Sequence, residues 1–276
     1  MAAKKKVLIF TPGGVGGAER MSINIAKMLA DANYDVKVVV FGRMTEVLNI
    51  IPAHLSVIRI PFHNKYCFSL TRMWWVIMRE RADIVFSSVA AFNPRVIVAA
   101  KLAKKKIVVR SSNMIGTYVP LKLLKTKITY PLVDRLIAQQ EDMRQEMIDI
   151  LRVKSEKIIT LHNPLDGVEI DRLASSPNPY PKACAINYVN VARINYNKGQ
   201  DILIKAFAKV KRKVSDAHLW LIGSFKEKDS FYRDLISLIE SFSIGDSVHL
   251  VGYDKNPFKW TKYADCFVLP SRVEGL

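Results

Sequence analysis

The sequence has 276 residues, of which half are apolar and 24% are charged. This balance excludes a disordered chain and a membrane-embedded bundle, and the length suits one large or two modest domains. The formal net charge of +17 favours an anionic partner, which can be a nucleic acid, a lipid head-group surface or a phosphorylated small molecule.

Three cysteines, Cys67, Cys184 and Cys266, are too few and too far apart to predict a disulfide or zinc framework. We expect them to be buried small apolar side chains in a reducing compartment. The apolar run at residues 7–10 is too short for a signal peptide, and the longest apolar candidate, residues 84–100, contains Asn93, Pro94 and Arg95. The sequence therefore predicts a cytoplasmic protein.

Short β-branched runs alternate with helical patterns through the first part of the chain. Strands are predicted at residues 7–10, 36–41, 57–60, 84–86, 107–109, 136–138 and 157–161, and helices at 18–30, 71–81, 94–102 and 141–151. The first helix has an apolar stripe at Met21, Ile25, Met28 and Leu29. Such alternation predicts an α/β domain with a parallel sheet covered on both faces.

A proline-rich segment at 173–182 interrupts the pattern and predicts a linker. The alternation then resumes with strands at 186–191, 218–222, 248–251 and 266–269. The helix predicted at 199–212 has Ile202, Leu203, Ala206, Phe207 and Val210 inward. We therefore predict an N-terminal Rossmann-like domain at 1–172 and a C-terminal one at 183–276, facing a cleft. Four strands are few for such a sheet, so we expect the second domain to be incomplete.

A glycine-rich loop, residues 13–17, joins the first strand to the first helix. Glycine lets a backbone approach a ligand closely, and a helix start offers free N–H groups to an anion. The loop does not match the dinucleotide-binding pattern, because Glu19 occupies the place of its third glycine. A simple tight turn is the alternative interpretation.

Two cations, Arg193 and Lys198, lie five residues apart between a predicted strand and helix. Ligands of open α/β sheets bind at the carboxyl ends of strands. Arginine can bind phosphate oxygens with two hydrogen bonds, and lysine adds a point charge. This pair can stabilise a departing diphosphate without a metal ion. The alternative is an exposed loop with two solvated charges.

The segment 191–207 resembles family 4 glycosyltransferases, a retaining group with the GT-B fold. The resemblance continues at 221–223, 251–253 and 263–271, ends at Glu274-Gly275, and includes 16–20 and 162–164 in the first half. It implies that Arg193 and Lys198 hold the donor diphosphate and that Glu274 faces the transferred sugar. It also implies that Gly16 and Gly17 belong to the donor side, whereas Glu19 and Arg20 face the acceptor.

The sequence departs from the family pattern at two places. The family's second donor glutamate, eight positions after Glu274, lies beyond Leu276, and the histidine common after the strand at 107–110 is absent. Asn113 lies in that region and can donate and accept hydrogen bonds, but it cannot act as a base near neutral pH. It remains an acceptor-side candidate.

Neither a metal ion nor another cofactor is expected, and the nucleotide sugar is a substrate. The five histidines have no ligand spacing, and no Asp-x-Asp occurs to hold a divalent ion against a nucleotide.

The excess of positive charge is concentrated between Asp83 and Asp134, where no acidic residue occurs. The cations there are Arg95, Lys101, Lys104, Lys105, Lys106, Arg110, Lys122, Lys125 and Lys127. Apolar residues interleave with the later lysines, which favours an anionic membrane surface. A solvated basic helix face is the alternative, and nucleic acid is not expected because no known binding module is present.

We therefore predict a retaining glycosyltransferase that uses a nucleotide sugar and a glycan or lipid-linked acceptor in surface glycan assembly. A non-catalytic remnant with a folded acceptor domain is the second hypothesis. A nucleotide-sugar epimerase is the third, but no convincing set of acid-base side chains supports it.

Overall fold

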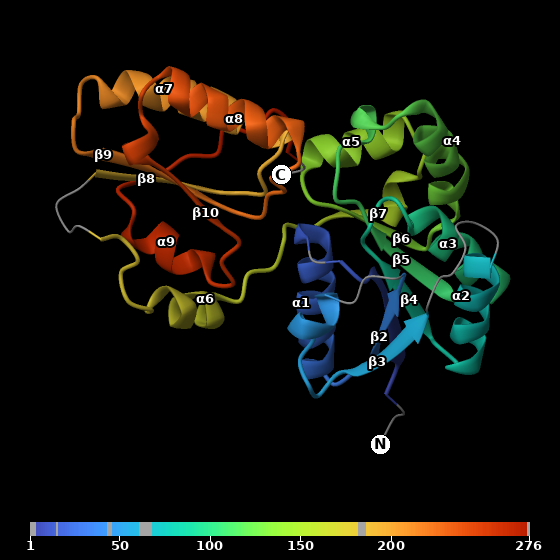
Figure 1. Ribbon diagram of the computed structural model, residues 1–276. Helices are drawn as coiled ribbons and strands as arrows, with labels where there is room; N and C mark the ends of the chain where they lie inside the picture. Colours follow the sequence, from blue (N-terminus) through green and yellow to red (C-terminus); the bar gives the residue numbers. More distant parts are fainter. Residues whose placement is uncertain (1–3, 15, 43–45, 61–67, 182–185, 275–276) are drawn as a thin grey trace. The chain divides into compact units, whose positions relative to one another are not determined.

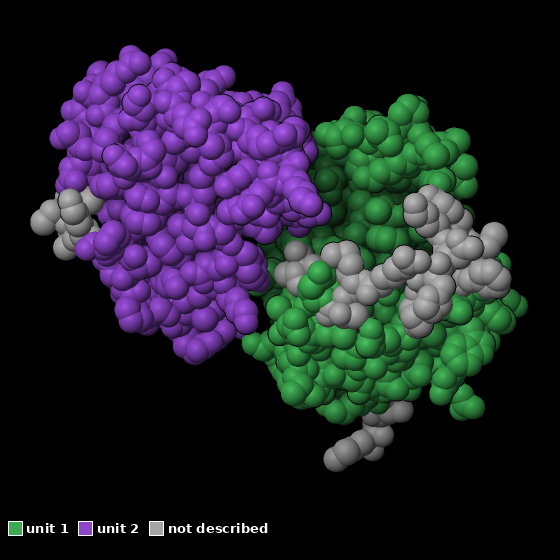
Figure 2. All heavy atoms as spheres, viewed as in Figure 1, with its two compact units in different colours: residues 1–164, 275–276 green, residues 165–274 purple. Residues whose placement is uncertain are grey.

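The computed structural model describes the chain except for residues 1–3, 15, 43–45, 61–67, 182–185 and 275–276. The described chain divides into two compact units, residues 1–164 and 165–274 (Figure 2). The second unit begins before the predicted linker at 173–182, because helix α6 (Gly167–Ala174) packs on helix α9 (Pro257–Tyr263). The Asn256 amide fixes this contact by donating a hydrogen bond to the Leu173 carbonyl at 2.8 Å.

The first unit contains a seven-stranded parallel sheet with the order β3-β2-β1-β4-β5-β6-β7 (Figure 1). The strands are β1 (Lys6–Pro12), β2 (Asp35–Phe41), β3 (Ser56–Ile60), β4 (Ile84–Ser87), β5 (Lys106–Arg110), β6 (Arg135–Ala138) and β7 (Ile158–Thr160). The helices are α1 (Gly17–Asp31), α2 (Phe68–Arg79), α3 (Asn93–Leu102), α4 (Pro120–Thr129) and α5 (Glu141–Asp149). The predicted alternation of strands and helices is confirmed.

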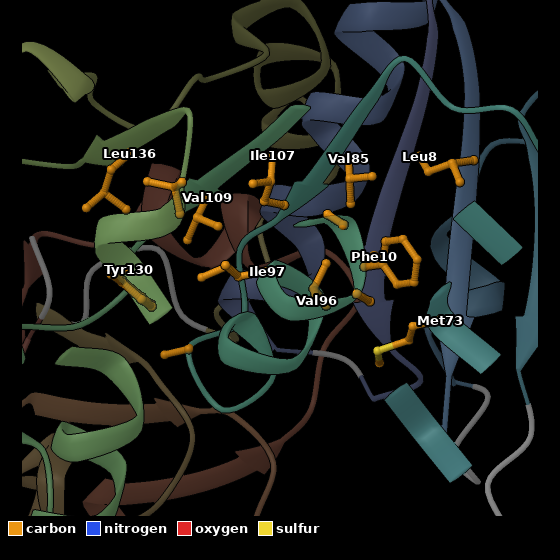
Figure 3. Packing of buried hydrophobic residues seen from close by; sticks show 14 of the residues in the cluster. Leu8, Phe10, Met73, Val85, Val96, Ile97, Ile107, Val109, Tyr130 and Leu136 are labelled. Carbon is orange, nitrogen blue, oxygen red and sulfur yellow. The ribbon is translucent and has the colours of Figure 1, made fainter. Parts of the chain in front are cut away.

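Alternate side chains of the strands enter two apolar cores, one on each face of the sheet. Leu8 and Phe10 of β1 pack with Met73 of α2 and Ile97 of α3 in the larger core (Figure 3). On the other face, Val7 and Ile9 pack against Ile23 of α1.

The stripe predicted for α1 is confirmed only in part, because Ile25 and Leu29 are half-buried against the core and Met21 is half-buried. Ser22, Ile23 and Ala26 are buried, whereas Met28 is 52% exposed. The small side chains of Ser22 and Ala26 let α1 approach β1 and β2, which it contacts.

The second unit contains a four-stranded parallel sheet with the order β10-β9-β8-β11. Its strands are β8 (Ile186–Val191), β9 (Ala217–Ile222), β10 (Val248–Gly252) and β11 (Cys266–Phe267), and the helices after α6 are α7 (Gln200–Lys211), α8 (Ser230–Ser241) and α9. Leu203 and Phe207 of α7 are buried as predicted, but Ile202 and Ala206 are exposed. Ile204 and Ala208 occupy the core instead, so the buried face is rotated from the predicted one.

The predicted burial of the cysteines is wrong for Cys266, which is exposed on the edge strand β11. Cys67 and Cys184 lie outside the described residues. Within the described ranges, no helix is both long and apolar enough to cross a membrane.

A stack of aromatic rings lies at the β9–β10 side of the second sheet. His249 stacks on Trp220 with ring centroids 3.9 Å apart, and its Nε2 lies 3.1 Å from Nδ1 of His218. Burial, followed by the charge of His218, lowers the pKa of His249 from its usual 6.5. The unfolded chain therefore takes up the proton more readily, and stability is lost as the pH falls below about 6.5.

We expect the temperature of thermal unfolding of the second unit to decrease when the pH is lowered from 7.5 to 5.5. A His249→Gln variant should show a weaker pH dependence. An identical pH profile in the variant would contradict this role of His249.

Candidate active site

A cationic loop begins where β8, an interior strand of the second sheet, ends. Arg193 is exposed on this loop, and Lys198 is half-buried in a short 3-10 helix, Tyr196–Lys198. Gln200 is fully buried and donates hydrogen bonds to the Arg193 carbonyl at 3.1 Å and to Asn190 Oδ1 at 3.3 Å. The loop is thus held from beneath by a buried amide, and both cations lie at the carboxyl edge of the sheet.

Gly199 joins the 3-10 helix to α7 in the left-handed conformation, with φ of 68°. A Cβ atom at this position would lie 2.1 Å from the carbonyl oxygen of Pro270. Only glycine both adopts this left-handed backbone readily and leaves the space beside the Pro270 carbonyl empty. The close approach brings the chain after β11 against the start of α7.

Arg272 ties that later segment to the loop. Its guanidinium donates two hydrogen bonds to the Asp201 carboxylate, at 2.8 and 2.6 Å, and one to the Tyr196 carbonyl at 2.6 Å. It also lies 4.0 Å from the centroid of the Tyr196 ring. Arg272 and Asp201 are 71 residues apart in the sequence, and no sequence pattern predicted their pairing.

The same segment brings Glu274 to Lys198. The Lys198 Nζ atom lies 2.5 Å from Glu274 Oε1, and about 30% of each side chain is exposed (27% and 32%). Burial raises the pKa of Glu274, but the hydrogen bond and charge of Lys198 outweigh it, and the net shift is downward. Glu274 is therefore an anion at neutral pH. Two predicted site residues are brought together, 76 positions apart.

Arg193 is placed differently from Lys198. Glu274 pairs with Lys198 and Asp201 with Arg272, and among the described residues no salt bridge to Arg193 occurs. Its exposed guanidinium retains its donors for an external anion, and the flat fork of an arginine suits phosphate oxygens.

The remaining predicted residues lie in the first unit. Gly16 is the extended residue before α1, Gly17 begins the helix, and Glu19 and Arg20 follow in its first turn. Gly17 is exposed, and the other three residues are half-buried. The Ser22 hydroxyl lies 2.5 Å from that of Ser88, which fixes the start of α1 beside the end of β4.

Asn113 is exposed in the loop after β5, and its Oδ1 accepts a hydrogen bond from Ser112 at 2.9 Å. Since β1, β4 and β5 are neighbours, this loop and the start of α1 lie at the same edge of the sheet.

Comparison with known proteins assigns the chain to a family. A family model described as Glycosyltransferase Family 4 matches residues 15–167, more than half of the chain. The chain belongs to glycosyltransferase family 4. A second model, Glycosyl transferases group 1, matches residues 185–276, which include the cationic loop.

Relatives of this family 4 chain agree with the assignment. It is 25% identical to an uncharacterized glycosyltransferase of Haemophilus influenzae over 97% of the chain and 74% of that protein. It is 24% identical to a Campylobacter jejuni N-acetylgalactosaminyltransferase, named for a diphospho-undecaprenol substrate, over 54% of the chain and 38% of that enzyme. The matched segments span 38% to 74% of the relatives' lengths.

Solved structures identify the fold. The complex of Anabaena HepE with UDP-glucose matches 96% of this chain and 74% of HepE, with a TM-score of 0.81 at 17% identity. The family 4 chain thus has the GT-B fold, with two Rossmann-like domains, as the sequence predicted.

A buried arginine in the first unit was not recognised as a special position from the sequence. Arg110 ends β5, is 4% exposed, and donates a hydrogen bond from Nη2 to Asn163 Oδ1. Its Nη1 is buried without a partner among the described residues, and burial lowers the pKa of Arg110 to about 10. It lines a cavity of about 310 Å³ whose other walls are mostly apolar and include Ile25, Leu29 and Ile137.

Across the described ranges, no three His, Cys, Asp or Glu side chains are grouped so that they could hold a metal ion.

Proposed function

We propose that this family 4 protein transfers a sugar from a nucleoside-diphosphate sugar to an acceptor hydroxyl, with retention of the anomeric configuration. The bond between the anomeric carbon and the diphosphate oxygen breaks, and the acceptor oxygen forms the new bond and loses its proton. The nucleoside diphosphate leaves with the electron pair.

The observation that supports this proposal is the cationic loop at the end of β8. Arg193 and Lys198 lie where negative charge develops if a diphosphate departs across this edge of the sheet. Preorganised donors of this kind stabilise a departing anion without a metal ion. The complex of HepE with UDP-glucose, a protein of the same fold, supports a nucleotide-sugar donor.

Glu274 has a second task in this proposal. As an anion it can accept hydrogen bonds from hydroxyl groups of the transferred sugar, while its charge competes with the diphosphate for Lys198. Binding of the donor would then exchange the Lys198–Glu274 pair for two separate contacts, one to phosphate and one to sugar.

The acceptor side of the proposal is assigned to the first unit, with Glu19, Arg20 and Asn113 at its edge. The name of the Campylobacter relative supports an acceptor linked to a lipid diphosphate, as in the assembly of surface glycans. We propose that the protein works at the anionic cytoplasmic face of the membrane, without a metal or other cofactor.

A donor screen tests the reaction. Purified protein is incubated with a set of UDP-, GDP- and ADP-sugars and a membrane lipid extract, with and without EDTA, and released nucleoside diphosphate is measured. We expect release with one class of donor, unchanged by EDTA, and an α-linked product from an α-linked donor. Calorimetry that detects no nucleotide binding at millimolar concentration would instead favour the non-catalytic hypothesis.

A further inference from the structure

Helix α4 exposes several large apolar side chains on one side, where a helix that faces water usually carries polar residues. Leu121, Leu124 and Ile128 are each at least 55% exposed (63%, 55% and 63%), and their spacing of three and four residues places them on one side. Thr126 and Thr129 are buried on the inner side. The helix therefore exposes three of its large aliphatic residues, while a fourth, Leu123, is half-buried against the core.

Lysines flank this aliphatic stripe. Lys125 and Lys127 are exposed beside it, and no acidic residue occurs anywhere between Asp83 and Asp134. Lys122 lies with its Nζ atom 3.3 Å from the centroid of the Tyr118 ring. A stripe of leucine and isoleucine between lysines fits the boundary of an anionic bilayer, where aliphatic groups enter the acyl region and lysines reach the head groups.

A second group of exposed apolar residues lies on α2. Trp74, Trp75 and Met78 are 39%, 51% and 45% exposed, and the Arg79 guanidinium lies 4.9 Å from the Trp75 ring centroid. Helix α3 packs against both α2 and α4, and Figure 1 shows the three helices on one flank of the unit. Tryptophan is enriched at membrane interfaces because its ring is apolar and its N–H is polar.

We infer that the α2–α4 flank is the membrane-contacting surface, with α4 lying in the interface of an anionic bilayer and Trp74 and Trp75 as a second contact. The inference rests on the proposed function, because this surface would bring the protein to a lipid-linked acceptor in the membrane. The exposed loop with Asn113 lies seven residues before α4, so the acceptor-side edge of the sheet adjoins the inserted helix.

Vesicle binding by the purified chain tests this surface. Vesicles of phosphatidylcholine with 30% phosphatidylglycerol should bind the protein at low salt, and vesicles of phosphatidylcholine alone should bind it at least ~10-fold more weakly. Neutralising both flanking lysines (Lys125→Gln with Lys127→Gln) should weaken binding ~30-fold, at about 1 kcal/mol per basic residue. The triple change Leu121→Gln, Leu124→Gln and Ile128→Gln should weaken it to a similar extent or more.

Tryptophan emission gives an independent readout of insertion. Trp220 and Trp260 are buried, so a blue shift on adding vesicles should come from Trp74 and Trp75. We expect the shift to disappear in a Trp74→Phe, Trp75→Phe variant. A blue shift that persists in this variant would contradict the second contact.

Matched controls lie in the second unit. Lys205→Gln with Lys209→Gln removes two exposed lysines of α7, and Leu165→Gln with Val168→Gln removes two apolar residues that are 80% and 83% exposed. Neither pair should change vesicle affinity more than ~2-fold. All the exchanged side chains are exposed, and thermal scans verify that each variant folds.

Several outcomes would overturn the inference. They are equal binding to neutral and anionic vesicles, equal losses in the α4 and control variants, and a concentration-dependent dimer that the α4 triple variant abolishes. Salt-sensitive binding of RNA with no response to vesicles would overturn it as well. Nucleotide binding, measured separately without lipid, reports on the donor site alone, so failure there leaves the membrane result interpretable.

Discussion

Replacing Arg193 or Lys198 by alanine is expected to lower sugar transfer 10²- to 10³-fold, a loss of about 3–4 kcal/mol of transition-state stabilisation each. The structure places Lys198 beside the Glu274 carboxylate and leaves Arg193 exposed on the same loop. Because both cations act on the leaving diphosphate in the proposed mechanism, the loss should appear mainly in kcat rather than in KM. Steady-state kinetics with the preferred donor give both quantities.

Conservative variants and a distant control sharpen this test. Arg193→Lys keeps the charge but not the paired donors, so it should recover only part of the activity. Lys205→Ala, on an exposed position of α7, should leave the rate within ~2-fold of the parent. Turnover by Arg193→Ala or Lys198→Ala equal to the parent's would contradict the proposed role of that residue.

Replacing Gly199 by alanine is expected to destabilise the second unit by about 2–5 kcal/mol. A Cβ atom would lie 2.1 Å from the Pro270 carbonyl oxygen, and the backbone φ of 68° adds a further penalty of about 1–2 kcal/mol. The later segment must then move, which separates Glu274 from Lys198. Urea unfolding followed by the emission of the buried Trp220 and Trp260 measures the effect.

Gly245→Ala is the matched control for this substitution. A Cβ atom at Gly245 meets nothing within 4 Å, and its φ is not positive, so the change should shift stability by less than ~1 kcal/mol. If Gly199→Ala unfolds at the same urea concentration as the parent, the close contact with Pro270 does not constrain the loop.

The strands of both sheets could be predicted because parallel strands buried on two faces form short β-branched runs. Helix α4 could not be found by its apolar period, because Leu121, Leu124 and Ile128 point outward while Thr126 and Thr129 are buried. The same reasoning misplaced Ile202 of α7, which is exposed. Apolar periodicity therefore locates the apolar face of a helix, but it does not show whether that face is buried or exposed.

The sequence predicted some of the residues of the candidate site but not others. Arg193 and Lys198 stood out through their loop position and the family resemblance, and Glu274 through the resemblance alone; the structure places Lys198 and Glu274 in contact. Arg272 and Asp201 did not stand out, because nothing local links side chains 71 residues apart. The burial of Arg110 was also hidden, since its partner Asn163 lies on a different segment.

The ties between the loop after β8 and the segment after β11 have a consequence for protein synthesis. The side chains that tie Lys198, Asp201 and the Tyr196 carbonyl to the later segment are added to the growing chain about 70 residues later. Strand β8 can pair with β9 as soon as both have left the ribosome, but the loop reaches its final conformation only after Glu274 has emerged. Nascent chains that end before that residue should therefore carry paired strands and a loop that Gln200 holds at its start, but they should lack the Lys198–Glu274 pair.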